Sequence, residues 1–280
     1  HATVEFLNPY TIELELSSTD INRGEIVTLN ATVTDSLSLT PEIGAEVKFY
    51  DNNTLLGTAI TDDQGRASLD YNVPLDASYG EHIINATVYE GDINFSEVSD
   101  TLAVYMNVTI DATLSSSMVT REESITVSIT LTDELGNGLS DYTVELYDAT
   151  IDQVVDSGVT DVNGYVELVY GIPIDSPVGE HTLIVRLVNE PEYVRFTEVQ
   201  NTLEVYANTD LHIDLQVMEA DRGDTVEIIA TLTDNLLNGL EGYTLLFYAG
   251  TTLLGSEVTN SSGIATFQWL VDDSMLMGQQ

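Results

Sequence analysis

Two histidines at the same place in a repeated motif are the first candidates for chemistry. The motif reads P-L-D-A-S-Y-G-E-H and P-I-D-S-P-V-G-E-H, and it ends on His82 and His181. Histidine changes charge near neutral pH and is the commonest general acid or base. A catalytic residue rarely recurs in every copy of a repeat, whereas a structural one often does. We therefore expect both to hydrogen bond at a strand rim or turn, and the sequence carries no H-E-x-x-H, G-x-S-x-G or P-loop that predicts an enzyme.

Acidic and amide side chains offer the oxygen ligands that calcium prefers. The stretch Asp161-x-Asn163-Gly164 is similar to the first half of a calcium loop, but the bidentate glutamate that closes such loops is missing. A hairpin turn explains this stretch better. Calcium at the repeat junctions remains a hypothesis, and we expect no other cofactor. The junction candidates are Asp20, Asp111 and Asp210.

Six asparagines stand in Asn-x-Ser/Thr sequons, which are glycan acceptors on surface proteins. Two of them fall on the outward phase of their expected strands, where a glycan could be accommodated. The sequence therefore predicts that the chain is a glycoprotein, through some or all of these sites. The candidates are Asn30, Asn52, Asn85, Asn94, Asn107 and Asn260.

The charge balance excludes some classes of partner. The 280 residues include 47 acidic and only 7 basic residues, for a formal net charge of −40, and Lys48 is the only lysine. Such a chain has no cationic surface for nucleic acid or for anionic membranes. The acidity fits a highly soluble surface, adaptation to high salt, or loading with divalent cations. No run of 18 apolar residues is present, so we expect no direct membrane insertion in this segment.

The elements that position these residues repeat about every hundred residues. R-G-E-I-V-T-L-N-A-T-V-T-D begins at Arg23, and similar stretches begin at Arg121 and Arg222. Apolar and polar residues alternate in each copy, as Val27 and Leu29 do with Thr28. Alternation with period two predicts a β-strand with one buried and one wet face. The hundred-residue period predicts an array of small β domains.

Further repeated signals subdivide each domain into about seven strands. Asn-Gly at Asn137 and at Asn238 predicts tight turns, because both residue types tolerate positive φ. Hairpins are predicted to close on a left-handed glycine, at Gly65, Gly164 and Gly263. Two further sets of equivalent residues recur. The predicted core set is Tyr71, Tyr170 and Trp269, and the predicted outward set is Tyr50, Tyr147 and Tyr248.

The repeat spacing predicts where the domains begin and end. Residues 1–8 are predicted to be the closing strand of a preceding repeat, because Thr3 to Asn8 match the closing stretches T-L-A-V-Y-M-N and T-L-E-V-Y-A-N. The full repeats are predicted at 9–106 and 107–207, and an incomplete one, lacking its last strands, at 208–280. The first residue is His1 rather than Met, so we expect a processed chain or a piece of a longer one.

The order of these signals resembles a known family. The stretch from Gly80 to Ser96, followed by T-L-A-V-Y, is similar to the second half of bacterial immunoglobulin-like domains of the Big type. The resemblance implies an all-β fold of tandem immunoglobulin-like Greek-key β-sandwiches, as found in microbial adhesins, invasin-like proteins and surface-layer proteins. It implies no catalytic residues.

The resemblance leads to a prediction of function with two alternatives. The leading hypothesis is a non-enzymatic, extracellular rod at the cell surface, acting as a stalk or as a component of a surface layer or filament. Its partners would be other Ig-like repeats or copies of itself. The alternatives are an adhesin whose loops bind a glycan or a host or partner protein, and a spacer in a larger secreted enzyme.

Overall fold

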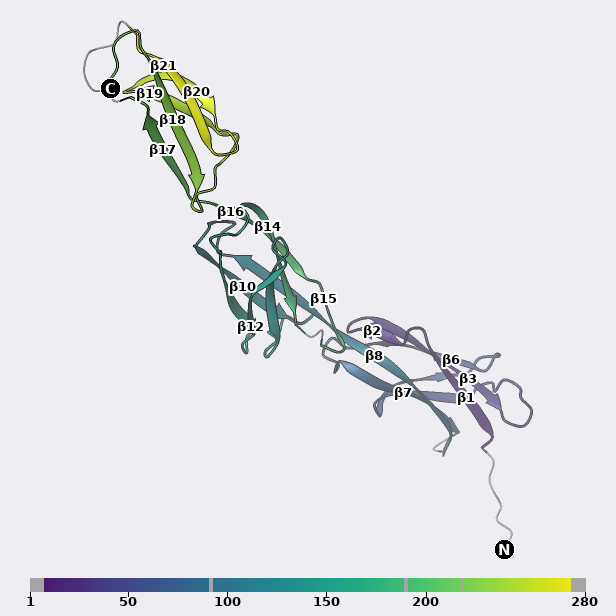
Figure 1. The fold of residues 1–280 in the computed structure, drawn as a ribbon. Helices are drawn as coiled ribbons and strands as arrows, with labels where there is room; N and C mark the ends of the chain where they lie inside the picture. Colours follow the sequence, from purple (N-terminus) through teal and green to yellow (C-terminus); the bar gives the residue numbers. More distant parts are fainter. Residues whose placement is uncertain (1–7, 91–92, 189–190, 218, 273–280) are drawn as a thin grey trace.

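The protein is a row of three β-sandwiches arranged end to end (Figure 1). The computed structural model describes residues 8–90, 93–188, 191–217 and 219–272. We call the sandwiches domain 1, domain 2 and domain 3, and keep the predicted bounds 9–106, 107–207 and 208–280 as proposed limits. The predicted all-β fold of tandem sandwiches is confirmed, and the described residues contain no helix that could span a membrane.

Domain 1 has two facing sheets. One sheet has the order β1-β3-β6, and the other has the order β8-β7-β4-β5, with β2 paired to β8. Domain 1 therefore has the seven predicted strands and the additional three-residue strand β2. The bounds are β1 (Tyr10–Leu16), β2 (Asp20–Asn22), β3 (Ile26–Asp35), β4 (Glu46–Asp51), β5 (Thr54–Ile60), β6 (Arg66–Asn72), β7 (Gly80–Glu90) and β8 (Ile93–Leu114).

Domain 2 shares a strand with domain 1. The second half of β8 pairs with β10, so this 22-residue strand closes one sandwich and opens the next. The two sheets of domain 2 have the orders β8-β10-β13 and β12-β11-β14-β16-β9. The new strands are β9 (Met118–Thr120), β10 (Ser124–Thr132), β11 (Thr143–Asp148), β12 (Gln153–Val159), β13 (Tyr165–Gly171), β14 (Gly179–Leu187), β15 (Val194–Phe196) and β16 (Val199–Tyr206).

Domain 3 repeats the first five long strands. Its sheets have the orders β17-β18-β21 and β19-β20. Residues 273–280 lie outside the described part of the chain, as do residues 1–7 of the predicted closing strand at 1–8. The strands are β17 (Thr209–Leu215), β18 (Thr225–Asp234), β19 (Thr244–Ala249), β20 (Thr252–Val258) and β21 (Ile264–Leu270).

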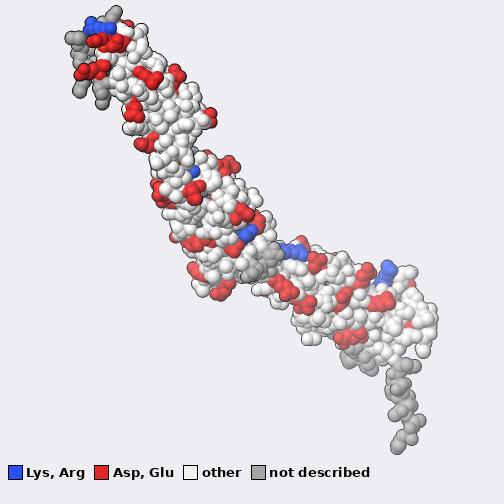
Figure 2. Space-filling model, in the orientation of Figure 1, with Lys and Arg blue, Asp and Glu red and all other residues white. Residues whose placement is uncertain are grey.

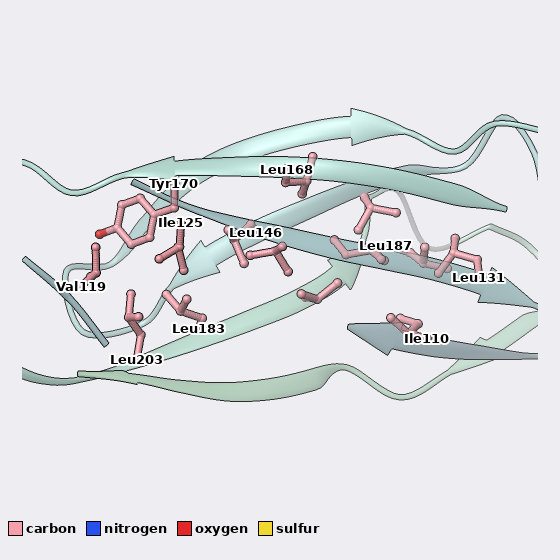
Figure 3. Packing of buried hydrophobic residues seen from close by; sticks show 14 of the residues in the cluster. Ile110, Val119, Ile125, Leu131, Leu146, Leu168, Tyr170, Leu183, Leu187 and Leu203 are labelled. Carbon is pink, nitrogen blue, oxygen red and sulfur yellow. The ribbon is translucent and has the colours of Figure 1, made fainter. Parts of the chain in front are cut away.

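The alternating strands bury the predicted face. Val27, Leu29, Ala31 and Val33 of β3 are fully buried, and β10 has the same pattern. Burial of one face of each sheet against the other supplies the main favourable free energy of such a sandwich. Figure 3 shows this core in domain 2, where side chains from both sheets interdigitate.

The apolar residues of β17 differ from this pattern. Leu211, Ile213 and Leu215 are about half exposed, whereas Ile12 and Leu16 of the equivalent β1 are buried. In domain 1 the strand β1 packs over β7 and β8, and the described part of domain 3 has only β19 and β20 in its second sheet.

The hairpin prediction is confirmed, and a tight turn is also present just before Asn137, where the Gly136 N–H donates to the Asp133 carbonyl. Gly65, Gly164 and Gly263 have positive φ, as predicted for the hairpins. Gly138 of the Asn-Gly pair does not, and the left-handed residues of that loop are Gly136 and Asp141. A Cβ on Gly138 would lie 2.1 Å from the carbonyl oxygen of Asn163. Glycine is needed there because another hairpin packs against the backbone, which is a long-range requirement.

The predicted limit near Asn107 falls inside β8 rather than in a loop. The buried side chains divide at this point, since Val104 packs in the core of domain 1 and Met106 in the core of domain 2. The chain therefore passes between the two cores without a linker.

Candidate functional site: the domain junctions

A buried tyrosine, aspartate and histidine lie together at one end of domain 2. The Asp148 carboxylate accepts a hydrogen bond of 2.8 Å from the Tyr170 hydroxyl, and Nδ1 of His181 lies 2.6 Å from the same oxygen. Nε2 of His181 lies 2.9 Å from the carbonyl oxygen of Pro177. The side chains of His181 and Asp148 have no exposed surface, so no substrate reaches them. The cluster is structural, as predicted for the histidines, but it is buried rather than at the rim.

Domain 1 contains the same cluster. The Tyr71 hydroxyl donates to Asp51 at 2.8 Å, and Nδ1 of His82 lies 2.7 Å from that carboxylate oxygen. Nε2 of His82 lies 2.9 Å from the carbonyl oxygen of Ser78. In both domains the histidine therefore joins a core carboxylate to the turn between two strands.

Burial and the neighbouring carboxylate both raise the pKa of the cluster tyrosines. Desolvation raises the pKa of Tyr170, and its hydrogen bond to Asp148 raises it further. The same two causes raise the pKa of Tyr71. Both hydroxyls therefore stay protonated and remain donors to the aspartate at neutral pH.

The third repeat lacks this cluster in its described residues. Ala249 follows Tyr248 where Asp51 follows Tyr50 and Asp148 follows Tyr147. Trp269 occupies the tyrosine position, since it pairs with Val226 as Tyr71 pairs with Val27. Trp269 is half-buried and packs against the core of domain 3. An apolar indole thus replaces a hydroxyl that would have no acceptor.

The histidine holds a turn that carries the junction to domain 3. This turn, residues 173–179, contains both Pro177 and Ser176. Nε of Arg121 donates to the carbonyl oxygen of Ser176 at 2.7 Å, and Nη1 reaches Asp234 in domain 3 at 3.1 Å. Nη1 also donates to the side chain of Asn235 at 3.3 Å. The buried cluster therefore fixes the turn, the turn positions Arg121, and Arg121 binds domain 3.

Arg23 is the equivalent residue at the junction of domains 1 and 2. Its Nη1 lies 3.6 Å from the Glu134 carboxylate of domain 2, and both side chains are largely buried. Its guanidinium lies 5.4 Å from the ring centroid of Tyr79, which belongs to the turn that His82 holds. Each arginine thus packs against the turn that the histidine holds. Asp133 and Asp234 are equivalent positions, and Arg121 binds Asp234 itself, whereas Arg23 reaches Glu134, the residue after Asp133.

The junction of domains 1 and 2 has a second connection. Strand β15 of domain 2 pairs in parallel with residues 106–108 of β8. Arg195 of β15 donates to Asp20 at 2.6 Å and to Asn22 at 2.8 Å, and its guanidinium lies 4.0 Å from the ring centroid of Tyr105. Three of the seven basic residues therefore lie at domain junctions, and Figure 2 shows basic groups at both junctions among the more numerous acidic groups.

The acceptor of Arg121 has a shifted pKa. Burial acts to raise the pKa of Asp234, but hydrogen bonds from the backbone and side chain of Asn238 outweigh it. The backbone N–H of Leu236 and the Arg121 guanidinium act in the same direction as Asn238, and the pKa falls to about 2. Asp234 is therefore ionised near neutral pH, as an ion pair across the junction requires.

One known protein family matches the sequence of domain 1. Residues 14–109 match the family described as bacterial Ig-like domain (group 3). Domain 1 is a bacterial Ig-like domain. Domain 3, and domain 2 apart from residues 107–109, lie beyond the matched residues. Domain 2 repeats the strand order of domain 1, and the described part of domain 3 repeats its first five long strands. No curated protein matches the sequence.

Several solved structures of adhesins are similar to this chain. The Yersinia pseudotuberculosis adhesin InvE has 13% identity and a TM-score of 0.38, covering 71% of this chain and 60% of that one. The Escherichia coli adhesin FdeC has 14% identity and a TM-score of 0.38, with coverage of 97% and 91%. A tetra-tandem repeat from the extending region of a large adhesion protein has 16% identity and a TM-score of 0.47, with coverage of 96% and 68%.

The acidic residues proposed for calcium are not brought together. Asp20 is paired with Arg195, and Asp111 and Asp210 are exposed on different strands of the Ig-like domains. Asp161 accepts hydrogen bonds from the backbone of Asn163 and Tyr165 within its hairpin. No group of three acidic or histidine side chains suited to a metal is found among the described residues.

The six sequons differ in how far their asparagines are exposed. Asn52 and Asn260 are exposed, whereas Asn30, Asn85 and Asn107 are half-buried. Asn30 accepts a hydrogen bond from Ser68, and Asn107 pairs with β15 at the junction. The side chain of Asn94 lies outside the described residues. Glycosylation stays a prediction, and Asn52 and Asn260 are the most accessible positions.

The predicted outward tyrosines, and the arginines of a groove near the junction of domains 1 and 2, mostly have partners within the chain. Tyr147 donates to Asp152 and lies against Arg186, and Tyr50 hydrogen bonds with Tyr89, whereas Tyr248 is exposed. A groove of about 760 Å³ beside β15 contains Arg186 and Arg195. Arg186 is paired with Glu145, and Arg195 with Asp20, so both cations already have acidic partners.

Proposed function

We propose that this chain is a non-enzymatic stalk segment of an extracellular bacterial surface protein, built to hold other parts of that protein away from the cell. The junctions carry the proposal. The same arginine, on an equivalent turn, reaches the equivalent loop of the next domain at both junctions. A repeated contact of this kind sets the same relation between successive domains, as a rod requires.

Strand β8 adds to the stiffness between domains 1 and 2. It has 22 residues, and at roughly 3.3 Å per residue a strand of this length spans about 70 Å. Flanking strands from both domains pair with it, so bending at the junction would break backbone hydrogen bonds. The acidic surface favours solubility and keeps neighbouring rods apart.

The alternatives place the function in the loops or outside the segment. An adhesin that grips a glycan needs exposed aromatic platforms or unpaired polar groups, and two of the three repeated tyrosines and both groove arginines already have partners. These contacts favour the stalk. A spacer within a secreted enzyme, and a subunit of a surface layer or filament, would use the same rod.

Small-angle X-ray scattering tests the stalk. We expect the 280-residue chain to be monomeric with a maximum dimension well above the roughly 70 Å of one such strand. Four Gly-Ser residues inserted between Tyr105 and Met106 should broaden the distance distribution. The same insertion between Leu37 and Ser38, in an exposed loop of domain 1, is the control and should not. A compact wild-type particle, or equal profiles for both insertions, would contradict the proposal.

A further inference from the structure

Domains 1 and 2 each contain a short parallel strand pair that the stalk alone does not require. β2 pairs with residues 103–105 of β8, and β9 pairs with residues 204–206 of β16. Parallel strands cannot be joined by a tight hairpin turn, so each pair needs a longer connection to bring its strands side by side. Their occurrence at the same place in both domains indicates a common role.

The two patches agree in their bonding. In domain 1 the patch is bounded by hydrogen bonds from Ala103 N–H to the Thr19 carbonyl, at 2.9 Å, and from Arg23 N–H to the Tyr105 carbonyl, at 3.0 Å. The central side chain, Ile21, is 5% exposed and belongs to the core of domain 1.

Domain 2 repeats these bonds at equivalent residues. Glu204 N–H donates to the Ser117 carbonyl at 2.9 Å, and Arg121 N–H donates to the Tyr206 carbonyl at 2.8 Å. Its central side chain, Val119, is 6% exposed and lies beside Leu203 in the core (Figure 3).

We propose that the chain bears tension and that these two parallel patches are the elements that resist it. The strands β1 and β2 lead into domain 1, and β8 leads out of it. Tension along the chain pulls β2 toward its amino end and β8 toward its carboxyl end. Because the strands are parallel, these forces slide one strand along the other, and all hydrogen bonds of the patch stretch together. A strand pair peeled from one end would break them one at a time.

The junction arginines connect the patches to the next domain. The backbone N–H of Arg121 closes the patch of domain 2, and its guanidinium binds Asp234 of domain 3. Arg23 does the same between domains 1 and 2. Force from the following domain therefore reaches the carboxyl end of the patch. The cover of β8 is also continuous, since β2 pairs with residues 103–105 and β15 with residues 106–108.

This role goes beyond the proposed stalk, because a rod can be stiff in bending and still unfold at low tension. The described residues of domain 3 contain no parallel strand pair. Pulled from both ends, the chain should show one high-force unfolding event from each of domains 1 and 2.

The test is single-molecule pulling of the full chain through its two ends. Proline at position 21 or 119 removes a backbone donor within the patch, and alanine at the same position removes the apolar side chain but keeps the donor. We expect Ile21→Pro to lower the force of one high-force event well below its value in Ile21→Ala, with the second event unchanged. Val119→Pro should lower the other event. Equal forces in the proline and alanine variants would overturn the proposal.

A second pulling geometry controls for damage to the fold. The chain has no cysteine, so Asp63→Cys gives a unique handle at the exposed β5–β6 turn. Pulling between this residue and the carboxyl end leaves β1 and β2 out of the force path. In this geometry domain 1 should unfold at the same force in Ile21→Pro and Ile21→Ala. The unfolding force of domain 2 in the same molecule serves as the internal reference.

If the proline variants do not fold, pulling the wild-type chain in both geometries still tests the proposal. Moving the handle from the amino end to position 63 should change the force of the domain 1 event and leave that of domain 2. Unchanged forces in both geometries would overturn the proposal. Scattering reports the shape without load, so failure of the stalk and failure of this proposal give different results.

Discussion

The two junctions of this chain use the same arginine but differ in how much else supports them. Between domains 1 and 2, Arg23 is joined by the continuous strand β8, by β15 and by Arg195. Between domains 2 and 3, the hydrogen bonds and ion pairs found in the described residues all come from Arg121. β16 ends at Tyr206 and β17 begins at Thr209, so no strand runs through.

The difference shows how a repeated chain can combine a rigid and a more adaptable connection. Redundant backbone pairing makes the first junction insensitive to any one side chain. The second depends on one side chain and on the turn that supports it. Loss of equivalent residues should therefore have unequal effects at the two junctions, and this inequality is open to measurement.

The largest effect is expected from the buried histidine of domain 2. His181→Ala leaves Asp148 without one partner and frees the turn that holds Arg121. Leaving a buried acceptor unpaired and opening a cavity where the imidazole packed together cost about 3–5 kcal/mol, so β10 and β14 should lose that much protection in hydrogen exchange. Energy transfer between labels in domains 2 and 3 should also broaden. His82→Ala should destabilise domain 1 and leave the adjoining junction in place, because β8 and β15 remain.

Exposed His212 provides the matched control. It lies 3.2 Å from Asp214, and both side chains are mostly exposed. His212→Ala should change the free energy of unfolding by less than about 1 kcal/mol. A loss as large as that for His181→Ala would contradict the role given to the buried cluster.

The next effect is the loss of the junction arginine itself. Arg121→Ala removes the donors to Asp234, Asn235 and the turn, and we expect a cost of about 1–3 kcal/mol, as for other buried acceptors left unpaired. The distance distribution between domains 2 and 3 should widen in pulsed electron resonance. Arg23→Ala is the comparison, and it should widen the distribution between domains 1 and 2 much less. Equal widening at both junctions would remove the asymmetry.

Acid should loosen the same contact. The pKa of Asp234 is lowered from its ordinary value of 3.8 to about 2. The stability that ionised Asp234 contributes is therefore fully present above pH 3.8 and is lost as the pH falls from about 4 to about 2. The distance distribution between domains 2 and 3 should therefore widen in this range, before the circular dichroism of the sandwiches is lost. In Asp234→Asn this distance distribution should already be wide at neutral pH and should change little in acid. A wild-type response centred near pH 6 would exclude Asp234 as the group responsible.

The fold could be predicted from the sequence because its main determinant is local. Alternation in β3 and β10 predicts which face is buried, and the hundred-residue period predicts the array. The Asn-Gly turns were explained wrongly, because Gly138 is required by contact with Asn163 from another hairpin. Local turn preferences do not contain that information.

The site was largely missed, because its contacts join residues distant in sequence. Arg121 and Asp234 are 113 positions apart, and periodicity shows that positions are equivalent without showing which ones touch. One signal was available. Arg23 and Arg121 are equivalent in a chain with only seven basic residues. The aspartates of the clusters also had a signal, since the repeat with Ala249 has Trp269 in place of tyrosine.

The smallest effect is expected at Arg195, and it bears most directly on the comparison. Arg195 and Asp20 are both partly exposed, and exposed ion pairs contribute about 0–1 kcal/mol. Because β8 and β15 hold the junction through backbone hydrogen bonds, Arg195→Ala should leave the distance distribution between domains 1 and 2 nearly unchanged at low and high salt. Arg195→Pro, which removes the same side chain and also the backbone donor at that position of β15, should widen it. If Arg195→Ala alone widens it as much as Arg121→Ala widens the other junction, then the first junction also depends on a single side chain.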